Sequence, residues 1–142
     1  MTKITDFHKR ETNFLSNFYP TSDPYPTLEH HYQAAKTLIP EEQEKILAAE
    51  TPGAAKKLGR KAHVRSDWEK VKLGVMEELL RRKFSDPELA ELLINTGDAE
   101  LIEGNYWHDN FWGDCSCEKC KRKEGKNHLG KLLMKIRSEL NE

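Results

Sequence analysis

The sequence predicts a mainly α fold, of the α+β class with minor short strands, arranged as one compact domain over residues 1–142. Three observations support this prediction. A chain of 142 residues has room for one core of ordinary domain size. Helix-start signals, in which Thr, Ser or Asp precedes Pro or an apolar run, recur along the chain. Neither an internal repeat nor a low-complexity tract interrupts it.

The charge balance is that of an ordinary soluble protein. The chain carries 23 Lys and Arg against 24 Asp and Glu, with 33% charged and 37% hydrophobic residues. This balance argues against a broad polyanion-binding surface. No stretch approaches the ~20 apolar residues that span a bilayer, and the N-terminus lacks the apolar segment of a secretory signal. We therefore expect a cytoplasmic protein without membrane contact.

The first 26 residues should be irregular, because Pro20, Pro24 and Pro26 restrict the backbone. A first helix is predicted over 28–38, with Thr27 as its N-cap and with its end before Pro40.

Two further helices follow, over 41–49 and over 53–62. Thr51 and Pro52 supply the cap and the first-turn proline of the second of these. Ser66 and Glu69 form a capping box that opens the longest predicted helix, which reaches about Phe84. Its apolar side chains recur at helical spacing at Trp68, Val71, Val75, Met76, Leu79 and Leu80.

The C-terminal part combines helices with a loop. Asp86 and Pro87 open a helix that Gly97 stops, and residues 99–103 suit a short strand. Residues 104–124 have no clean period and are predicted to form a long functional loop. The last helix places one apolar face at Leu129, Leu132, Leu133, Ile136 and Leu140.

One face of the first predicted helix is polar. Glu29, Tyr32, Gln33 and Lys36 fall at i, i+3, i+4 and i+7 and therefore share a face. Spacing alone fits either a solvated face or the wall of a cleft. Glu29 also suits the first turn of any helix, because the helix macrodipole favours an acid there.

Several segments of the chain resemble the NADAR (YbiA-like) family. They include Asn13-Phe14-Leu15-Ser16-Asn17-Phe18-Tyr19-Pro20 and Tyr25-Pro26-Thr27-Leu28-Glu29-His30. The resemblance continues in order through residues 32–36, 54–60, 65–68, 83–84, 96–98, 112–113 and 125–137. It implies a small, mostly helical fold and N-glycosidase activity on nucleotide-like ribosides. Members of this family cleave phosphoribosyl intermediates of riboflavin synthesis or remove ADP-ribose from guanine bases.

With that resemblance, the polar helix face becomes a candidate catalytic wall. Glu29 would act as an acid or base at an oxocarbenium-like centre. Lys36 would attack the ribose C1 if burial lowers its pKa, and is otherwise a surface lysine. Tyr32 and Gln33 would position sugar hydroxyls. Asp109 would supply a second carboxylate or simply be solvated.

The base and the phosphate of such a substrate need their own contacts. Trp112, followed by Gly113, is expected to stack on the base, and Trp68 either does the same or belongs to the core. The donors available for phosphate are Arg10, Asn17, Arg60, Arg65, Asn127 and Lys131. Spacing does not select among them. Gly125 would let the N-terminus of the last helix face an anion, although a plain turn serves equally well.

The cysteines are Cys115, Cys117 and Cys120. With His108 or His128 they would complete a Cys3His zinc site, but the one-residue gap departs from the usual spacing. We expect reduced thiols, with no metal and no cofactor, and keep zinc as the alternative.

The leading hypothesis is an N-glycosidase that hydrolyses the base–ribose bond of a small nucleotide or of an ADP-ribosylated nucleic-acid base. The first alternative is a non-catalytic ADP-ribose or nucleotide-binding module. The second is a zinc-stabilised interaction protein.

Overall fold

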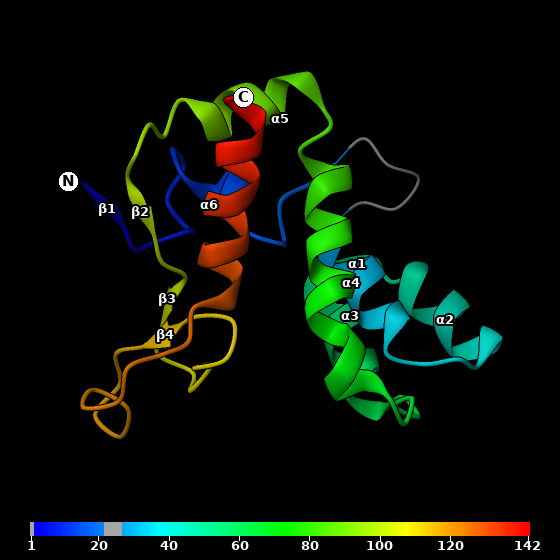
Figure 1. Ribbon diagram of the computed structural model, residues 1–142. Helices are drawn as coiled ribbons and strands as arrows, with labels where there is room; N and C mark the ends of the chain where they lie inside the picture. The colour runs from blue at the N-terminus through cyan, green and yellow to red at the C-terminus, as the bar shows by residue number, and fades with distance from the viewer. Residues whose placement is uncertain (1, 22–26) are drawn as a thin grey trace. The chain divides into compact units, whose positions relative to one another are not determined.

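The computed structural model describes residues 2–21 and 27–142 (Figure 1). The described residues form six α-helices, a 3-10 helix and four two-residue strands. They divide into two compact units, which we call the helical unit (Asn17–Lys83) and the terminal unit (Met1–Ser16 with Phe84–Glu142). Pro24 and Pro26 lie outside the described residues. Within the described part of the chain, no helix combines the length and the apolar character needed to cross a bilayer.

The helical unit is built around its first helix. The unit contains α1 (Leu28–Ala35), α2 (Pro40–Leu47), α3 (Pro52–Lys61) and α4 (Trp68–Lys83). Helix α1 contacts the other three helices, and buried Ala34, Ile46 and Ala55 form a small core between α1, α2 and α3. A central α1 is therefore held on several sides, which fixes the direction of its side chains.

Two of the predicted helix starts are confirmed by their caps. The Thr27 hydroxyl accepts from the His30 N–H at 3.3 Å, and the Thr51 hydroxyl accepts from the Ala54 N–H at 3.0 Å. The His30 ring strengthens the first cap. Its Nε2 lies 2.9 Å from the Ala49 carbonyl, which only accepts, so Nδ1 is the acceptor for the Thr27 hydroxyl at 2.8 Å.

Two predicted boundaries are wrong. Helix α1 ends at Ala35 rather than at residue 38, because the chain turns away and the Lys36 carbonyl accepts from the Arg65 N–H at 2.7 Å. Ser66 is not the cap of α4. The helix begins at Trp68, after Asp67, whose carbonyl accepts from the Val71 N–H at 3.1 Å.

The terminal unit packs two helices with short parallel strands. It contains β1 (Lys3–Ile4), the 3-10 helix η1 (Asn13–Leu15), α5 (Pro87–Ile94), β2 (Glu100–Leu101), β3 (Gly104–Asn105), β4 (Asp114–Cys115) and α6 (His128–Leu140). Strand β1 pairs with β2, and β3 pairs with β4, both in parallel. Helix α6 contacts β2 and α5. The predicted strand within 99–103 and the helix opened by Asp86 are confirmed.

The predicted loop over 104–124 is partly wrong, because it contains β3 and β4. Strand pairing needs backbone partners rather than a side-chain period, and two-residue strands leave no periodic signal. The Asp114 N–H donates to the Glu103 carbonyl at 2.9 Å, and the Ser116 N–H donates to the Asn105 carbonyl at 2.7 Å. These bonds fold the segment back on itself and bring its cysteines toward the end of β3.

Candidate active site

Glu29 is buried in α1, with 7% of its surface exposed. One helical turn later, the Gln33 Nε2 donates to the Glu29 Oε2 at 2.6 Å. The Glu29 backbone N–H donates to the Asn17 carbonyl at 3.1 Å. The i, i+4 spacing noted in the sequence therefore becomes a fixed carboxyl–carboxamide pair in the helical unit.

The pKa of Glu29 is raised above its ordinary value, chiefly because burial penalises the charged form. The Gln33 hydrogen bond opposes this shift, as do the positive charges of Lys56 and Lys36. A carboxyl in this environment keeps its proton to higher pH than an exposed glutamate. It can therefore give a proton to a departing group.

Two buried oxygens near this pair have no hydrogen-bond partner among the described residues. They are Gln33 Oε1 and Asn17 Oδ1, and Gln33 is only 2% exposed. A buried acceptor without a donor costs free energy, so such atoms in a native site indicate a donor supplied by water or by a ligand.

Lys36 follows the last turn of α1, at its C-cap. Burial lowers the pKa of its amine, the charge of Glu29 opposes this, and the charges of Lys56, Arg60 and Lys72 lower the pKa further. Its Nζ lies 5.8 Å from the centre of the Tyr32 ring. The sequence analysis required a lowered pKa for Lys36 to act as a nucleophile. The pKa of Lys36 is lowered in the structure.

The neighbours of Lys36 include two cations that sequence reasoning missed. Lys56 lies on α3 four residues before Arg60, and Lys72 lies on α4, where it pairs with Glu69 at 2.7 Å. We call Lys36, Lys56, Arg60 and Lys72 the basic cluster. The i, i+4 spacing of Lys56 and Arg60 places both on one face of α3. Because α3 packs on α1, this face brings their charges near Lys36.

Trp68 belongs to the core of the helical unit. Trp68 and Tyr32 are each 6% exposed, and their ring centres lie 5.2 Å apart at an interplanar angle of 57°. This geometry favours the core interpretation over base stacking for Trp68.

In the terminal unit, Asp109 and Trp112 form a turn. The Asp109 Oδ1 accepts from the Phe111 N–H at 3.1 Å and from the Trp112 N–H at 2.9 Å. The half-buried Trp112 ring meets the Phe111 ring edge-on, with centres 4.8 Å apart. Asp109 thus has a structural role in this turn, and its catalytic role stays a prediction.

Gly113 and Asn127 also have structural roles. A Cβ at Gly113 would overlap the Glu103 carbonyl. The buried Asn127 has φ 50° and ties the start of α6 to β2: its Oδ1 accepts from the Glu103 N–H at 3.0 Å, and its Nδ2 donates to the Leu101 carbonyl at 2.9 Å. Both polar atoms of the Asn127 carboxamide are thereby occupied.

The remaining phosphate candidates are dispersed. Arg10 and Lys131 are exposed in the terminal unit, and Arg60 is exposed in the helical unit. Arg65 is held by Asp67 through two hydrogen bonds of 2.6 and 3.0 Å. The structure gathers Glu29, Gln33, Lys36 and Arg60 in one unit with Asn17, Tyr32 and Trp68, and it places Arg10, Asp109, Trp112, Gly113, Asn127 and Lys131 in the other.

Two further features, beyond Lys56 and Lys72, were missed by sequence reasoning. Lys83 is 5% exposed at the end of α4, and burial lowers its pKa to about 7. A cavity of about 680 Å³ in the terminal unit is lined in part by the exposed Tyr106 and Trp107, and none of the predicted site residues lines it. Tertiary packing produces both features, and the local sequence carries no signal for either.

The chain belongs to the NADAR family. The family model, described as the NADAR domain, matches residues 6–141 and so runs through both units. The fold is similar to the NMR structure of the Escherichia coli protein YbiA, with a TM-score of 0.83 and 36% identity over 99% of this chain and 87% of that chain. This likeness confirms the mainly α fold with minor strands.

Curated relatives extend the comparison. N-glycosidase YbiA of Escherichia coli (strain K12) is 38% identical over 147 residues, which cover 89% of this chain and 88% of that protein. Riboflavin biosynthesis protein VVA0006 of Vibrio vulnificus is 39% identical over 146 residues and matches 96% of this chain. The matched region spans only 38% of the length of that protein.

Proposed function

We propose that this protein is an N-glycosidase that hydrolyses the bond between a base and the ribose of a nucleotide-like substrate. The name of the curated relative N-glycosidase YbiA supports the reaction class. The observation that carries the proposal is the buried Glu29 carboxyl, whose raised pKa and hydrogen bond to Gln33 suit a positioned general acid.

In the proposed reaction, Glu29 acts first as a general acid and then as a general base. Its proton passes to the base as the C1–N bond breaks, and the bonding electron pair leaves with the base. The carboxylate that remains stabilises the oxocarbenium-like sugar, then takes a proton from the water that attacks C1. The products are the free base and a sugar with a C1 hydroxyl, and Glu29 regains its proton.

The surrounding residues would bind the rest of the substrate. Gln33 Oε1 and Asn17 Oδ1 would accept hydrogen bonds from sugar hydroxyls. Lys56 and Arg60 of the basic cluster would contact phosphate. Tyr32 lies on the same helix face. The substrate contacts predicted from the sequence for Asp109, Trp112 and Lys131 stay predictions.

Lys36 has two proposed roles that differ in chemistry. In the first, its neutral amine bonds to C1 of the ribose as the C1–N bond to the base breaks and the base takes the Glu29 proton. The amine nitrogen then loses a proton as the C1–O4′ bond opens to give an imine and a ring hydroxyl, and water later hydrolyses the imine to release the sugar and the free amine. In the second, its positive charge steadies Glu29 or a phosphate. The lowered pKa of Lys36 supports the first role.

The proposed substrates are phosphoribosylamino-pyrimidine intermediates of riboflavin synthesis and ADP-ribosylated guanine. Incubation of the full chain with each compound, followed by mass spectrometry of the released base, tests both. We expect the wild type and the exposed control Glu44→Gln to release base and Glu29→Gln to lose at least ~100-fold of the rate. Tight ADP-ribose binding without base release from either compound would instead support the non-catalytic binding module.

A further inference from the structure

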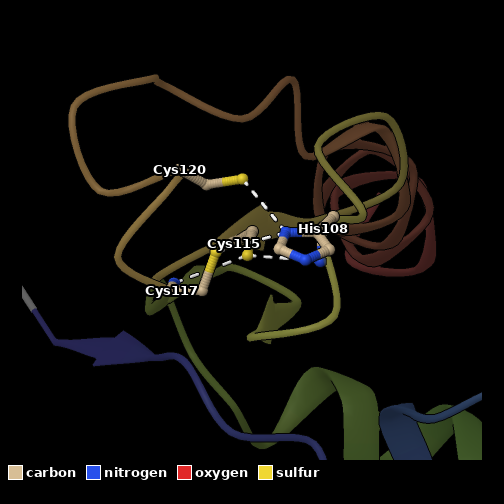
Figure 2. A group of neighbouring side chains, drawn as sticks. All are labelled: His108, Cys115, Cys117 and Cys120. Carbon is tan, nitrogen blue, oxygen red and sulfur yellow. Dashed lines mark hydrogen bonds between the residues drawn. The ribbon is translucent and has the colours of Figure 1, made fainter.

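Four side chains of the types that ligate metals converge in the terminal unit. His108, Cys115, Cys117 and Cys120, which we call the Cys3His cluster, each offer one ligand atom, and these atoms all lie within 4.8 Å of one another. Figure 2 shows the three thiols and the imidazole turned toward a common centre. The other candidate ligand, His128, instead packs its ring on Phe111 with centres 4.6 Å apart.

We propose that the Cys3His cluster binds one Zn²⁺ ion as a structural centre that holds residues 105–120 in place. The proposal is independent of the proposed glycosidase activity. Binding forms three Zn–S bonds and one Zn–N bond, and the thiol protons leave to solvent without any redox change.

The separations between donor atoms fit tetrahedral zinc. With Zn–S bonds of about 2.3 Å and a Zn–N bond of about 2.1 Å, two sulfurs lie about 3.8 Å apart and sulfur and nitrogen about 3.6 Å apart. The His108 Nδ1 lies 3.2 Å from the Cys117 Sγ and 3.6 Å from the Cys120 Sγ. Only small side-chain shifts are needed to admit the ion.

The backbone around the cluster is arranged for a thiolate. The N–H groups of His108 and Cys117 both point at the Cys115 Sγ, at 3.3 and 3.5 Å. Such donors stabilise a negatively charged sulfur and orient it, as outer-shell partners of metal ligands do. His108 has φ 69°, a left-handed conformation that a side chain other than Gly adopts at a cost, and this conformation accompanies its inward-facing ring.

The cysteine ligands come from two neighbouring segments, the end of β4 and the turn that follows it. Cys115 is the last residue of β4, and its N–H donates to the Asn110 Oδ1 at 2.8 Å. A tight turn then carries Cys117 to Cys120, closed by the Cys120 N–H to the Cys117 carbonyl at 3.0 Å. The one-residue gap between Cys115 and Cys117 is therefore bridged by the end of a strand rather than by a knuckle turn, which explains the departure from the usual spacing.

The segment is held mainly by hydrogen bonds, and its apolar side chains contribute little to a core. Tyr106 and Trp107 are exposed by 74% and 41%, and the strands β3 and β4 have two residues each. A structural ion commonly supplies the folding free energy that a small apolar core cannot. All four positions of a tetrahedral ion would be filled by the protein, so the ion would be structural rather than catalytic.

Metal analysis of the full chain tests the proposal directly. We expect about one Zn²⁺ per chain after purification under reducing conditions. After removal of zinc with a chelator, added Co²⁺ should give the sulfur-to-cobalt charge-transfer band and the intense d–d bands of a tetrahedral site. Purified protein that holds no zinc and gives no such bands with Co²⁺ would overturn the proposal.

Variants assign the ligands. His108→Asn removes the imidazole but tolerates the left-handed backbone, and Cys120→Ser removes one thiol. We expect each to weaken Co²⁺ binding by at least ~100-fold, while Lys119→Ala, an exposed position between two ligands, binds like the wild type. Binding equal to wild type in His108→Asn, or a disulfide among the three cysteines in place of metal in the freshly isolated protein, would contradict the assignment. If Cys120→Ser fails to fold, the Co²⁺ titrations of His108→Asn and of the wild type still test the ligand assignment.

Discussion

Gln33 occupies the space that a side chain at Gly59 would need. A Cβ at position 59 would overlap the Gln33 Oε1, and it would lie 2.8 Å from the Gln33 Cδ. Helix α3 therefore approaches α1 closely at this point, and the Gln33 carboxamide is held between the α3 backbone and the Glu29 carboxyl. Gln33 positions the proposed general acid Glu29, and the absence of a side chain at Gly59 leaves the space that Gln33 occupies.

Gly59→Ala should therefore disturb the site as well as the fold. We expect a stability loss of about 1–3 kcal/mol, as for an overpacked core, together with a loss of activity as Gln33 is pushed from Glu29. Gly53→Ala is the matched control in the same helix, because a Cβ there meets only the Thr51 hydroxyl at 3.9 Å. Thermal unfolding and turnover of both variants check this, and equal behaviour of the two would contradict the packing argument.

The pH dependence of turnover should follow the Glu29 carboxyl. Its pKa is raised above 4.5 by burial, so the protonated form persists to higher pH than in an exposed glutamate. A general acid works only while protonated, and kcat/KM should fall as pH rises through the raised pKa. The residual activity of Glu29→Gln should lack this alkaline limb. A profile that instead falls toward acid would mean that Glu29 acts as a carboxylate from the start.

Borohydride should distinguish the two roles of Lys36. If the amine captures the sugar, reduction during turnover adds a ribosyl-derived mass to the peptide that contains Lys36, and Lys36→Arg is inactive. Arginine retains the charge but not the nucleophilic amine. An active Lys36→Arg without any adduct in the wild type would leave hydrolysis by water alone.

Lys83 should make the folding stability depend on pH. Its pKa falls from 10.5 to about 7 on burial, so between these values the unfolded chain binds more protons than the folded one. The free energy of unfolding should therefore rise with pH across this interval, by up to about 1.4 kcal/mol per pH unit from this group. Lys83→Met should remove that slope, whereas the exposed Lys70→Met on the same helix should keep it. Urea titrations at several pH values measure it.

The two tryptophans should respond differently to truncation. Trp112→Ala should weaken substrate binding by about 1–3 kcal/mol with little change in the unfolding midpoint, if its ring stacks on the base. Trp68→Ala should lose about 3–5 kcal/mol of stability, because its ring is buried against Tyr32. Calorimetric binding of ADP-ribose and thermal unfolding separate the two effects. A large stability loss with unchanged affinity in Trp112→Ala would place that ring in the core.

Local signals carried most of the fold prediction. The caps at Thr27, Thr51 and Asp86 depend on side chains two or three residues from the groups they satisfy, so the sequence contains what is needed. The roles of Asn127 depend instead on backbone groups at Leu101 and Glu103, on another element, and local sequence patterns do not record such contacts.

The candidate site divides in the same way. Glu29 and Gln33 lie one helical turn apart, and their pairing was visible as spacing. Lys56 became part of the candidate site only because α3 packs on α1. The sequence offered both His108 and His128 as partners of the cysteines, and the pairing of β3 with β4 selects His108. Contacts between elements are set by the global packing of the chain, which local spacing does not encode.

The basic cluster sets how ionic strength would act on this protein. The chain as a whole has a formal charge of −1, so it exerts no general attraction on anions. Positive charge is nevertheless concentrated in this cluster: Lys56, Arg60 and Lys72 act on Lys36, and Lys36 and Lys56 act on the Glu29 carboxyl. A field of that kind reaches about 8 Å at physiological salt. A phosphorylated substrate would be drawn to this face from solution, while its neutral nucleoside would arrive by unguided diffusion. Salt would then slow the encounter with the charged substrate and leave the bond-breaking step inside the buried pair unchanged.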